Sequence, residues 1–258
     1  MNKNKILGLT NKINVKNNIL YKESHIFCDD YLNRNNEIAI YDQLNKIKNK
    51  YVIIPFAYQK ETLFTSQTLF FKNVKTLSQV NVCTNKMLTI INIIKNIHNL
   101  KLENIAVFKP LDFLMFFKSN VQKEIQQLKV FDSRIIKILN NYWDDGSYPV
   151  FSHNDLVLNN FINFKKGWKV IDFEYASYNH YLFDYASFIS ESLPVKKHDK
   201  FIELLNLTEK EKKKLSDLIL FQNYLWSYWA LYMFEKTNNS IFINIMNDKI
   251  NALFKTRS

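Results

Sequence analysis

Residues 151–188 constrain the fold of this chain more than any other segment. They open with His153-Asn154-Asp155-Leu156, reach Asn160, and continue with two short apolar runs on either side of Lys165-Lys166-Gly167. Short β-prone runs around a glycine-containing turn predict a β-hairpin. The second run ends at Asp172, so polar side chains lie at both ends of the predicted hairpin.

The predicted hairpin indicates a metal site. With a turn centred near residue 166, Asn160 and Asp172 oppose each other where the two strands begin and end, and cross-strand side chains lie roughly 5 Å apart. Mg²⁺ takes oxygen ligands and usually binds one or two carboxylates together with nucleotide phosphates. We therefore expect Asn160 and Asp172 to hold Mg²⁺.

Asp155 precedes Asn160 by five residues, on the loop that leads into the hairpin. Protein kinases have a proton-accepting Asp followed at this spacing by a metal-binding Asn, and later by a metal-binding Asp. The pattern predicts phosphoryl transfer from a nucleotide to a hydroxyl group, with Asp155 as the base.

Four short stretches resemble the choline/ethanolamine kinases, in the aminoglycoside-phosphotransferase-like branch of the protein-kinase fold. They are His153-Asn154-Asp155-Leu156, Asn160-Phe161-Ile162, Ile171-Asp172-Phe173-Glu174-Tyr175-Ala176 and Phe183-Asp184. The resemblance implies an ATP- and Mg²⁺-dependent kinase that phosphorylates choline or a close amino alcohol. It also implies that His153 braces the catalytic loop and that Asp184 fixes this loop through backbone hydrogen bonds.

The expected fold is α+β and two-lobed, as in protein kinases. Residues 1–72 contain short β-prone runs around one helix, which is typical of a small antiparallel sheet that binds the nucleotide. Residues 73–258 form the larger, mainly helical lobe with the catalytic and acceptor sites, and the hinge follows residue 72. Strands are expected at 12–15, 19–22, 51–56, 63–65 and 68–71, and helices at 37–47, 87–98, 121–142 and after 208.

A glycine near the N-terminus marks a candidate nucleotide loop. Leu7-Gly8-Leu9-Thr10-Asn11 resembles the family's GGxTN loop, with Leu7 in place of the first glycine. The resemblance implies that Gly8, Thr10 and Asn11 bind the nucleotide, with backbone N–H groups close to its phosphates. A plain turn is the alternative for a single glycine.

Kinase chemistry also needs a cation on the nucleotide phosphates, oriented by a carboxylate on a helix. Lys22 ends a predicted strand and Glu37 starts a predicted helix, so these two residues are the candidates. The stretch Asn33-Arg34-Asn35-Asn36-Glu37 resembles the family's Arg-x-x-Glu signature, which supports Glu37. The alternative is a pair of exposed charges.

The acceptor site is expected on a late helix. Thr208 begins a Thr-x-x-Glu capping box, and the helix that follows carries Trp226 and Trp229 on one face. Such aromatic stripes usually belong to the core. The family resemblance implies instead that both tryptophans, with Tyr175 and Glu191, bind a quaternary ammonium group, which ring faces hold at about 0.5 to 2 kcal/mol each.

The net charge and the cysteine content limit which molecules the protein is expected to bind. The net charge is +11, but the lysines are spread without a basic arm, which predicts a solvated surface that attracts nucleotides and binds no nucleic acid. Cys28 and Cys83 form no metal-binding or disulfide pattern, and no apolar run approaches eighteen residues. We expect a cytoplasmic protein without stable membrane insertion, and no sequence feature indicates an oligomeric state.

Alternatives to a choline kinase stay open at this stage. Ethanolamine differs from choline only by N-methyl groups, and an aminoglycoside or another small alcohol would use the same chemistry. An inactive kinase-fold binding module and a basic nucleic-acid-binding protein are the alternatives from other classes. Intact Asp155, Asn160 and Asp172 favour an active enzyme.

Overall fold

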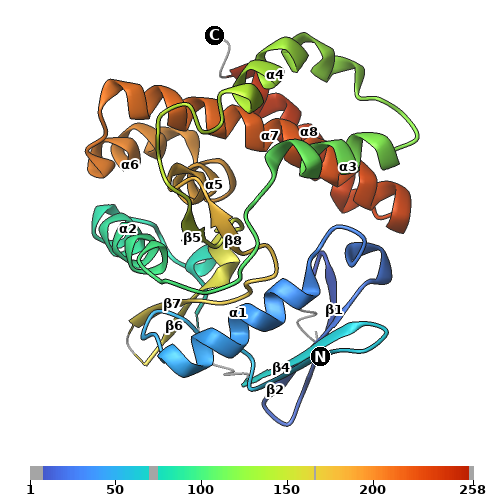
Figure 1. Cartoon of the computed structure of the whole chain (residues 1–258), viewed down its shortest axis with the longest axis vertical. Coiled ribbons are helices and arrows are strands. Elements are labelled where there is room, and N and C mark those ends of the chain that lie inside the picture. Colours follow the sequence, from blue (N-terminus) through green and yellow to red (C-terminus); the bar gives the residue numbers. More distant parts are fainter. Residues whose placement is uncertain (1–7, 70–74, 166, 256–258) are drawn as a thin grey trace.

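A small sheet near the N-terminus and a larger helical part lie at opposite ends of the molecule (Figure 1). The computed structural model describes residues 8–69, 75–165 and 167–255. Two further sheets of two strands each lie between the two ends. The predicted α+β architecture, with a small antiparallel sheet and a larger helical part, is confirmed. The expected boundary at residues 72 and 73 falls outside the described residues.

The N-terminal sheet is antiparallel, with strand order β1-β2-β4-β3. Asn17 and Asn18, between β1 and β2, have φ angles of 52° and 60°, the left-handed conformations of a tight hairpin turn. The strands are β1 (Asn11–Lys16), β2 (Ile19–Ser24), β3 (Ala57–Lys60) and β4 (Phe64–Leu69).

Two strand predictions in this region are wrong. The strand expected at 51–56 is an isolated parallel bridge between Val52 and Val170, and Pro55, which lacks a backbone N–H, interrupts pairing before β3. The strands expected at 63–65 and 68–71 are one strand, because the polar residues between them pair with β2 and β3. Residues 70 and 71 lie outside the described residues.

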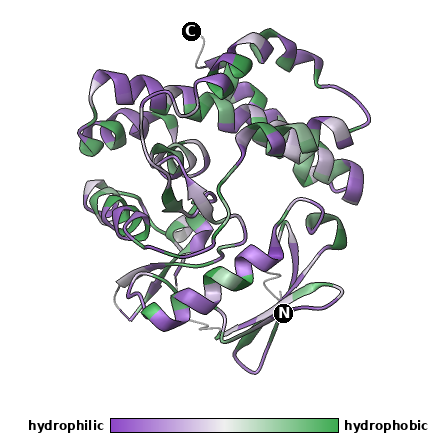
Figure 2. Cartoon of the chain, in the orientation of Figure 1, coloured by the Kyte–Doolittle hydropathy of each residue, from purple (hydrophilic) through white to green (hydrophobic). Residues whose placement is uncertain are grey.

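Helix α1 (Arg34–Ile47) packs beside this sheet. Its N-cap Asn33 accepts a hydrogen bond from the backbone N–H of Asn36. Hydrophobic and hydrophilic residues alternate along α1 and α2 in Figure 2, as in helices with one buried face. The buried apolar residues of α1 are Ile40, Tyr41 and Leu44, whereas Ile47 of the apolar pattern lies in the last turn and is 45% exposed.

The central hairpin is confirmed, with a register one residue away from the prediction. Strand β6 (Phe161–Phe164) pairs with β7 (Gly167–Val170) so that Phe161 opposes Val170. Asn160 therefore lies beside Ile171, whose backbone N–H donates to its carbonyl, and not beside Asp172. The neighbouring sheet pairs β5 (Val150–Ser152) with β8 (Ser177–Asn179).

The helical part is built on α7 (Glu209–Thr237), which packs against α5 (Leu182–Ser192) and α8 (Ser240–Lys255). The predicted capping box of Thr208 and Glu211 is present at its start. Helix α2 (Thr84–His98) buries an apolar face that contains Met87, Ile90, Ile91, Ile94 and Ile97. Within the described ranges, no helix is long and apolar enough to cross a membrane.

The single helix expected at 121–142 is wrong. The chain forms α3 (Pro110–Asn120) and α4 (Asp132–Asn140), joined through a 3-10 turn. The backbone N–H of Gln122 donates to the carboxylate of Glu235 at 3.0 and 3.1 Å, so a tertiary contact takes a donor that a continuous helix would use. Helix α6 (His198–Leu205) follows α5 and precedes α7. The 3-10 turns span Ile26–Cys28, Leu77–Gln79, Gln126–Phe131, Leu158–Asn160 and Val195–Lys197.

Candidate active site

The loop after β5 carries Asp155, and a residue of α5 holds this loop in place. Asp184, fully buried on α5, accepts hydrogen bonds from the backbone N–H groups of His153 at 3.0 Å and Asn154 at 2.8 Å. The Nε2 atom of His98 lies 2.9 Å from the same carboxylate. These bonds confirm the expected contacts of Asp184. Burial alone would raise the pKa of Asp184, but the hydrogen bonds from His98 and Asn154 lower it overall.

His153 connects the catalytic loop to the end of the hairpin. Its Nε2 lies 3.0 Å from the carbonyl oxygen of Ile171, and its ring centroid lies 4.8 Å from that of Phe173. Burial lowers the pKa of His153, so the neutral imidazole is favoured and donates to this carbonyl. The expected bracing role of His153 agrees with these contacts.

Asp155 and Asn160 are in direct contact. The Nδ2 atom of Asn160 donates to the carbonyl oxygen of Asp155 at 2.8 Å and to its carboxylate at 3.1 Å. This orientation leaves the Oδ1 atom of Asn160 as the oxygen that could bind a cation. Burial, together with the charges of Asp172, Glu174 and Glu191, raises the pKa of Asp155 from 3.8 to about 8. Once ionised, Asp155 is a stronger base than an ordinary aspartate.

Lys22 lies among three carboxylates. Its Nζ atom is 2.5 Å from Asp172, 2.9 Å from Glu174 and 3.9 Å from Glu37. Burial alone would lower the pKa of Lys22, but the three charges together raise it. Lys22 and Glu37 are both buried, so the alternative of two exposed charges is wrong.

Arg34 is a second buried cation, which sequence reasoning used only as a signature residue. Its guanidinium binds Glu37 at 2.7 Å, Asp29 at 2.8 Å and Glu174 at 3.1 Å, and the side chain is 1% exposed. Glu37 also accepts a hydrogen bond from Tyr41 at 2.9 Å. The main partner of Glu37 is therefore Arg34, and the predicted Lys22 partner is more distant.

The turn at Gly8 requires a glycine. A Cβ atom there would lie 2.3 Å from the carbonyl oxygen of Asn11 and 2.9 Å from the side chain of Ile13. Any larger residue at this position would therefore force the backbone to shift. Leu7, the departure from the family's loop pattern, lies outside the described residues.

Glu174 links this turn to both buried cations, and sequence reasoning did not select it. Its carboxylate accepts hydrogen bonds from Thr10 at 2.6 Å and Asn11 at 3.0 Å, and it pairs with Lys22 and Arg34. Burial would raise the pKa of Glu174, yet these four partners hold it below its ordinary value. Because both side chains bind Glu174, contacts of Thr10 and Asn11 with a nucleotide would come from their backbone.

Asn160 and Asp172 form a donor set that fits Mg²⁺. Both residues lie at the same end of the hairpin, because the backbone N–H of Ile171, the residue before Asp172, donates to the carbonyl oxygen of Asn160. An amide oxygen and a carboxylate suit Mg²⁺ when nucleotide phosphates complete its coordination. Across the described ranges, no group of three or more His, Cys, Asp or Glu side chains could hold a metal alone.

Aromatic side chains from distant parts of the chain meet beside the catalytic loop. The ring centroid of Trp226 lies 5.6 Å from Tyr175, 5.7 Å from Trp229 and 6.2 Å from Phe113, each near perpendicular. The indole N–H of Trp229 donates to the hydroxyl of Tyr31 at 3.1 Å. The structure thus brings Tyr175, Trp226 and Trp229 together, and adds Phe113 and Tyr31, which no sequence pattern indicated.

Glu191 lies next to the catalytic loop, in contact with a lysine. Ser192, its neighbour, donates to the carbonyl oxygen of Leu156 at 2.9 Å, which is one residue after Asp155. The Glu191 carboxylate forms an ion pair with Lys249 of α8. Glu191 is therefore near the predicted base, but its charge is already matched within the protein.

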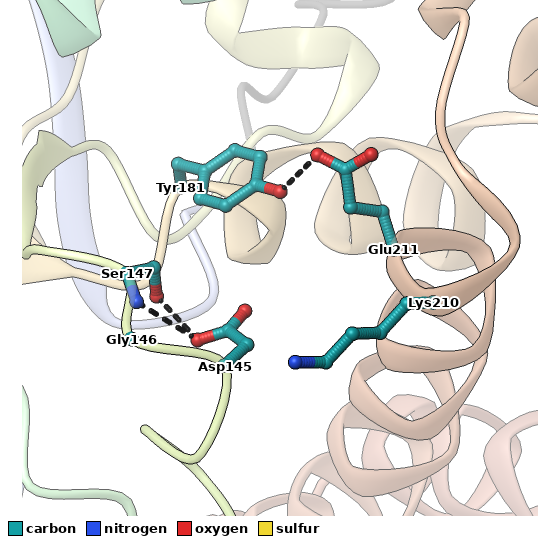
Figure 3. A pocket seen from close by; sticks show the side chains of 6 residues that line it. All are labelled: Asp145, Gly146, Ser147, Tyr181, Lys210 and Glu211. Atoms are coloured by element: carbon teal, nitrogen blue, oxygen red, sulfur yellow. Dashed lines mark hydrogen bonds between the residues drawn. The ribbon is translucent and has the colours of Figure 1, made fainter.

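A separate cavity of about 200 Å³ lies away from these residues. It is lined by Asp145, Gly146, Ser147, Tyr181, Lys210 and Glu211. Figure 3 shows that Ser147 bonds Asp145 and that Tyr181 bonds Glu211, so polar groups of its wall satisfy one another. Asp145 belongs to a turn, as expected, with Gly146 at a φ of 75°. We assign no function to this cavity.

Comparisons with known proteins agree with this geometry. Residues 89–206, just under half of the chain, match the model of a family described as "Phosphotransferase enzyme family". This match agrees with the predicted resemblance to phosphotransferases. No curated protein matches the sequence significantly. The phosphotransferase segment contains Asp155, Asn160, Asp172 and Glu191, whereas Lys22 lies outside it.

Solved structures share the fold over nearly the whole chain. The choline kinase LicA from Streptococcus pneumoniae is 19% identical, with a TM-score of 0.77, over 97% of this chain and 92% of that one. An ethanolamine kinase from Plasmodium vivax is 18% identical, with a TM-score of 0.72, over 96% and 80%. An aminoglycoside phosphotransferase in complex with gentamicin is 16% identical, with a TM-score of 0.61, over 94% and 88%. The protein-kinase-like fold predicted for this chain is thereby confirmed.

The raised pKa of Asp155 predicts a pH-dependent stability. Between 3.8 and about 8, the folded protein binds more protons at Asp155 than the unfolded chain does, so stability falls as pH rises through this window and is level above it. Urea unfolding should show Asp155→Asn gaining stability relative to wild type from pH 5 to pH 8.5. A difference that is constant across this range would contradict the raised pKa.

The contacts of Glu174 predict a change in nucleotide binding. Glu174→Gln removes the charge that pairs with Lys22 and Arg34 and should raise the KM for ATP about tenfold, the effect of one charge-assisted contact, with a smaller change in kcat. The control is Glu23→Gln, because Glu23 forms an exposed ion pair with Lys12 and such pairs contribute little. A fall in kcat with an unchanged KM for ATP would contradict this prediction.

Proposed function

We propose that the protein is an ATP- and Mg²⁺-dependent kinase that phosphorylates the hydroxyl group of choline, or of a close amino alcohol, to give phosphocholine or its analogue. The observation that carries this proposal is the group of rings around Trp226, which adjoins the catalytic loop because the side chain of Asn154 donates to the carbonyl oxygen of Tyr175 at 2.9 Å. A quaternary ammonium group has no N–H to donate, and aromatic faces attract its charge. Trp226 and Trp229 are largely buried, at 8% and 7% exposed, as the walls of an enclosed pocket would be.

Asp155 is the proposed base. It accepts the proton of the acceptor hydroxyl as the oxygen attacks the γ-phosphorus of ATP, while the bond from phosphorus to the oxygen of ADP breaks. The pKa of Asp155 near 8 favours proton transfer at neutral pH. Asn160 and Asp172 are the proposed Mg²⁺ ligands, and the bound ion would neutralise charge that develops on the phosphates.

The nucleotide side of the proposal uses the sheet and α1. Lys22 would bind phosphate oxygens, and Glu37 would act on it through the cluster that also contains Arg34. Gly8, Thr10 and Asn11 would cover the nucleotide through their backbone. We propose residues 1–72 as the nucleotide lobe, residues 73–258 as the catalytic and acceptor lobe, and the cytoplasm as the setting.

Choline is preferred to aminoglycosides because the acceptor side has little free negative charge. The pairing of Glu191 with Lys249 leaves aromatic rings as the main attraction for a cation. An aminoglycoside carries several amines and needs several acidic partners. Ethanolamine is the alternative within the same chemistry, and an inactive binding module is the alternative from another class. Asp155, Asn160 and Asp172 favour an active enzyme.

ATP turnover on a panel of acceptors tests the proposed function. With Mg²⁺ present, we expect turnover with choline and none above background with aminoglycosides. Asp155→Asn should lower kcat at least about 100-fold, since general base catalysis contributes 10² to 10⁴. Turnover on aminoglycosides alone would reject the choline proposal. A folded protein that turns over none of the acceptors would support the inactive module.

Substitution of Trp226 tests the cation pocket. Trp226→Ala should raise the KM for choline about tenfold, which corresponds to the loss of one to two kcal/mol of ring attraction, and should affect the KM for ethanolamine less. Trp143→Ala is the matched control, because the ring of Trp143 packs against those of Tyr142 and His180, at centroid distances of 5.2 and 5.7 Å. Equal effects of Trp226→Ala on both acceptors would return the tryptophan to a purely structural role.

A further inference from the structure

Lys22 and Lys249 are the buried lysines among the described residues. Lys22 lies among the carboxylates on the nucleotide side, where a cation is needed. Lys249 lies on α8 and pairs with Glu191 of α5, on the acceptor side. Both side chains of this second pair are largely covered, at 10% and 17% exposure. The proposed reaction gives Lys249 no task, although burial of a charged pair is costly.

The position of the pair is fixed by the residues on either side of Glu191. Ser192 donates to the carbonyl oxygen of Leu156 at 2.9 Å, directly after the proposed base. Ser190 lies 3.4 Å from Oε1 of Gln222 on α7, one helical turn before Trp226. The charge of Glu191 is also among those that raise the pKa of Asp155, so its carboxylate lies on the side of the catalytic loop where a small amino alcohol would bind.

The two candidate acceptors place different demands on this carboxylate. A primary ammonium has three N–H donors, and a buried donor without a partner costs about 1 to 3 kcal/mol. A quaternary ammonium has none, so it loses no hydrogen bond when nearby oxygens are already bound. In the structure the ammonium of Lys249 binds one carboxylate oxygen of Glu191 and offsets its charge, so the carboxylate attracts a second primary amine less strongly.

We propose that Lys249 is a specificity-determining residue that disfavours primary-amine acceptors by binding the carboxylate of Glu191. The inference rests on the proposed function and deepens it. It assigns the choice between a methylated and an unmethylated amino alcohol to an internal cation, whereas the rings supply attraction for both. A pair that serves stability alone would affect both acceptors equally when broken.

The test compares kcat/KM for choline and ethanolamine in three variants. Lys249→Met keeps an unbranched apolar stem and frees the carboxylate. Lys249→Met/Glu191→Gln removes both charges, which usually costs less stability than leaving one buried charge alone. Lys213→Met, an exposed lysine of α7, is the matched control. Thermal unfolding of each variant confirms that it is folded at the assay temperature.

We expect Lys249→Met to raise the ratio of kcat/KM for ethanolamine over choline about tenfold, the gain of one charge-assisted hydrogen bond. The ratio should return towards the wild-type value in Lys249→Met/Glu191→Gln and stay unchanged in Lys213→Met. An unchanged ratio in folded Lys249→Met with choline turnover intact would overturn the assignment of Lys249 alone. A wild-type protein that phosphorylates neither acceptor would overturn the proposed function and this inference together.

Discussion

The pairing of Glu174 with Lys22 and Arg34 is the interaction on which the N-terminal half of the site depends. Neither cation could be buried at this depth without carboxylate partners, because an isolated buried charge costs far more than a single hydrogen bond. The same carboxylate accepts hydrogen bonds from Thr10 and Asn11. The sheet, α1 and the segment after β7 thus meet at one buried side chain.

A comparable arrangement holds the catalytic loop in the C-terminal half. Asp184 fixes the backbone of His153 and Asn154 and is itself bound by His98. Both arrangements use a buried carboxylate to fix a loop through directional bonds, and such bonds restrict a loop more closely than apolar packing does. Asp155 lies between the two, which explains why several negative charges act on its pKa.

The sequence predicts the hairpin, the catalytic loop and the capped helix α7, because each depends on neighbours within a few residues. It fails where distant residues decide the outcome. Glu235 ends α3 from more than a hundred residues away, and Phe113 reaches Trp226 only after folding. The position of Lys249 could have been predicted from the local sequence, because a lysine within the apolar stripe of α8 indicates a buried partner.

Residues 172–175 are consecutive in the chain, and each contacts a different part of the structure. Asp172 contacts Lys22, Phe173 is buried, Glu174 binds the N-terminal turn, and Tyr175 joins the aromatic rings. A change of backbone at any of the four would displace groups on both the nucleotide and the acceptor sides. Redesign of acceptor choice is therefore better begun on α7 and α8, whose side chains reach the rings and Glu191 without belonging to this segment.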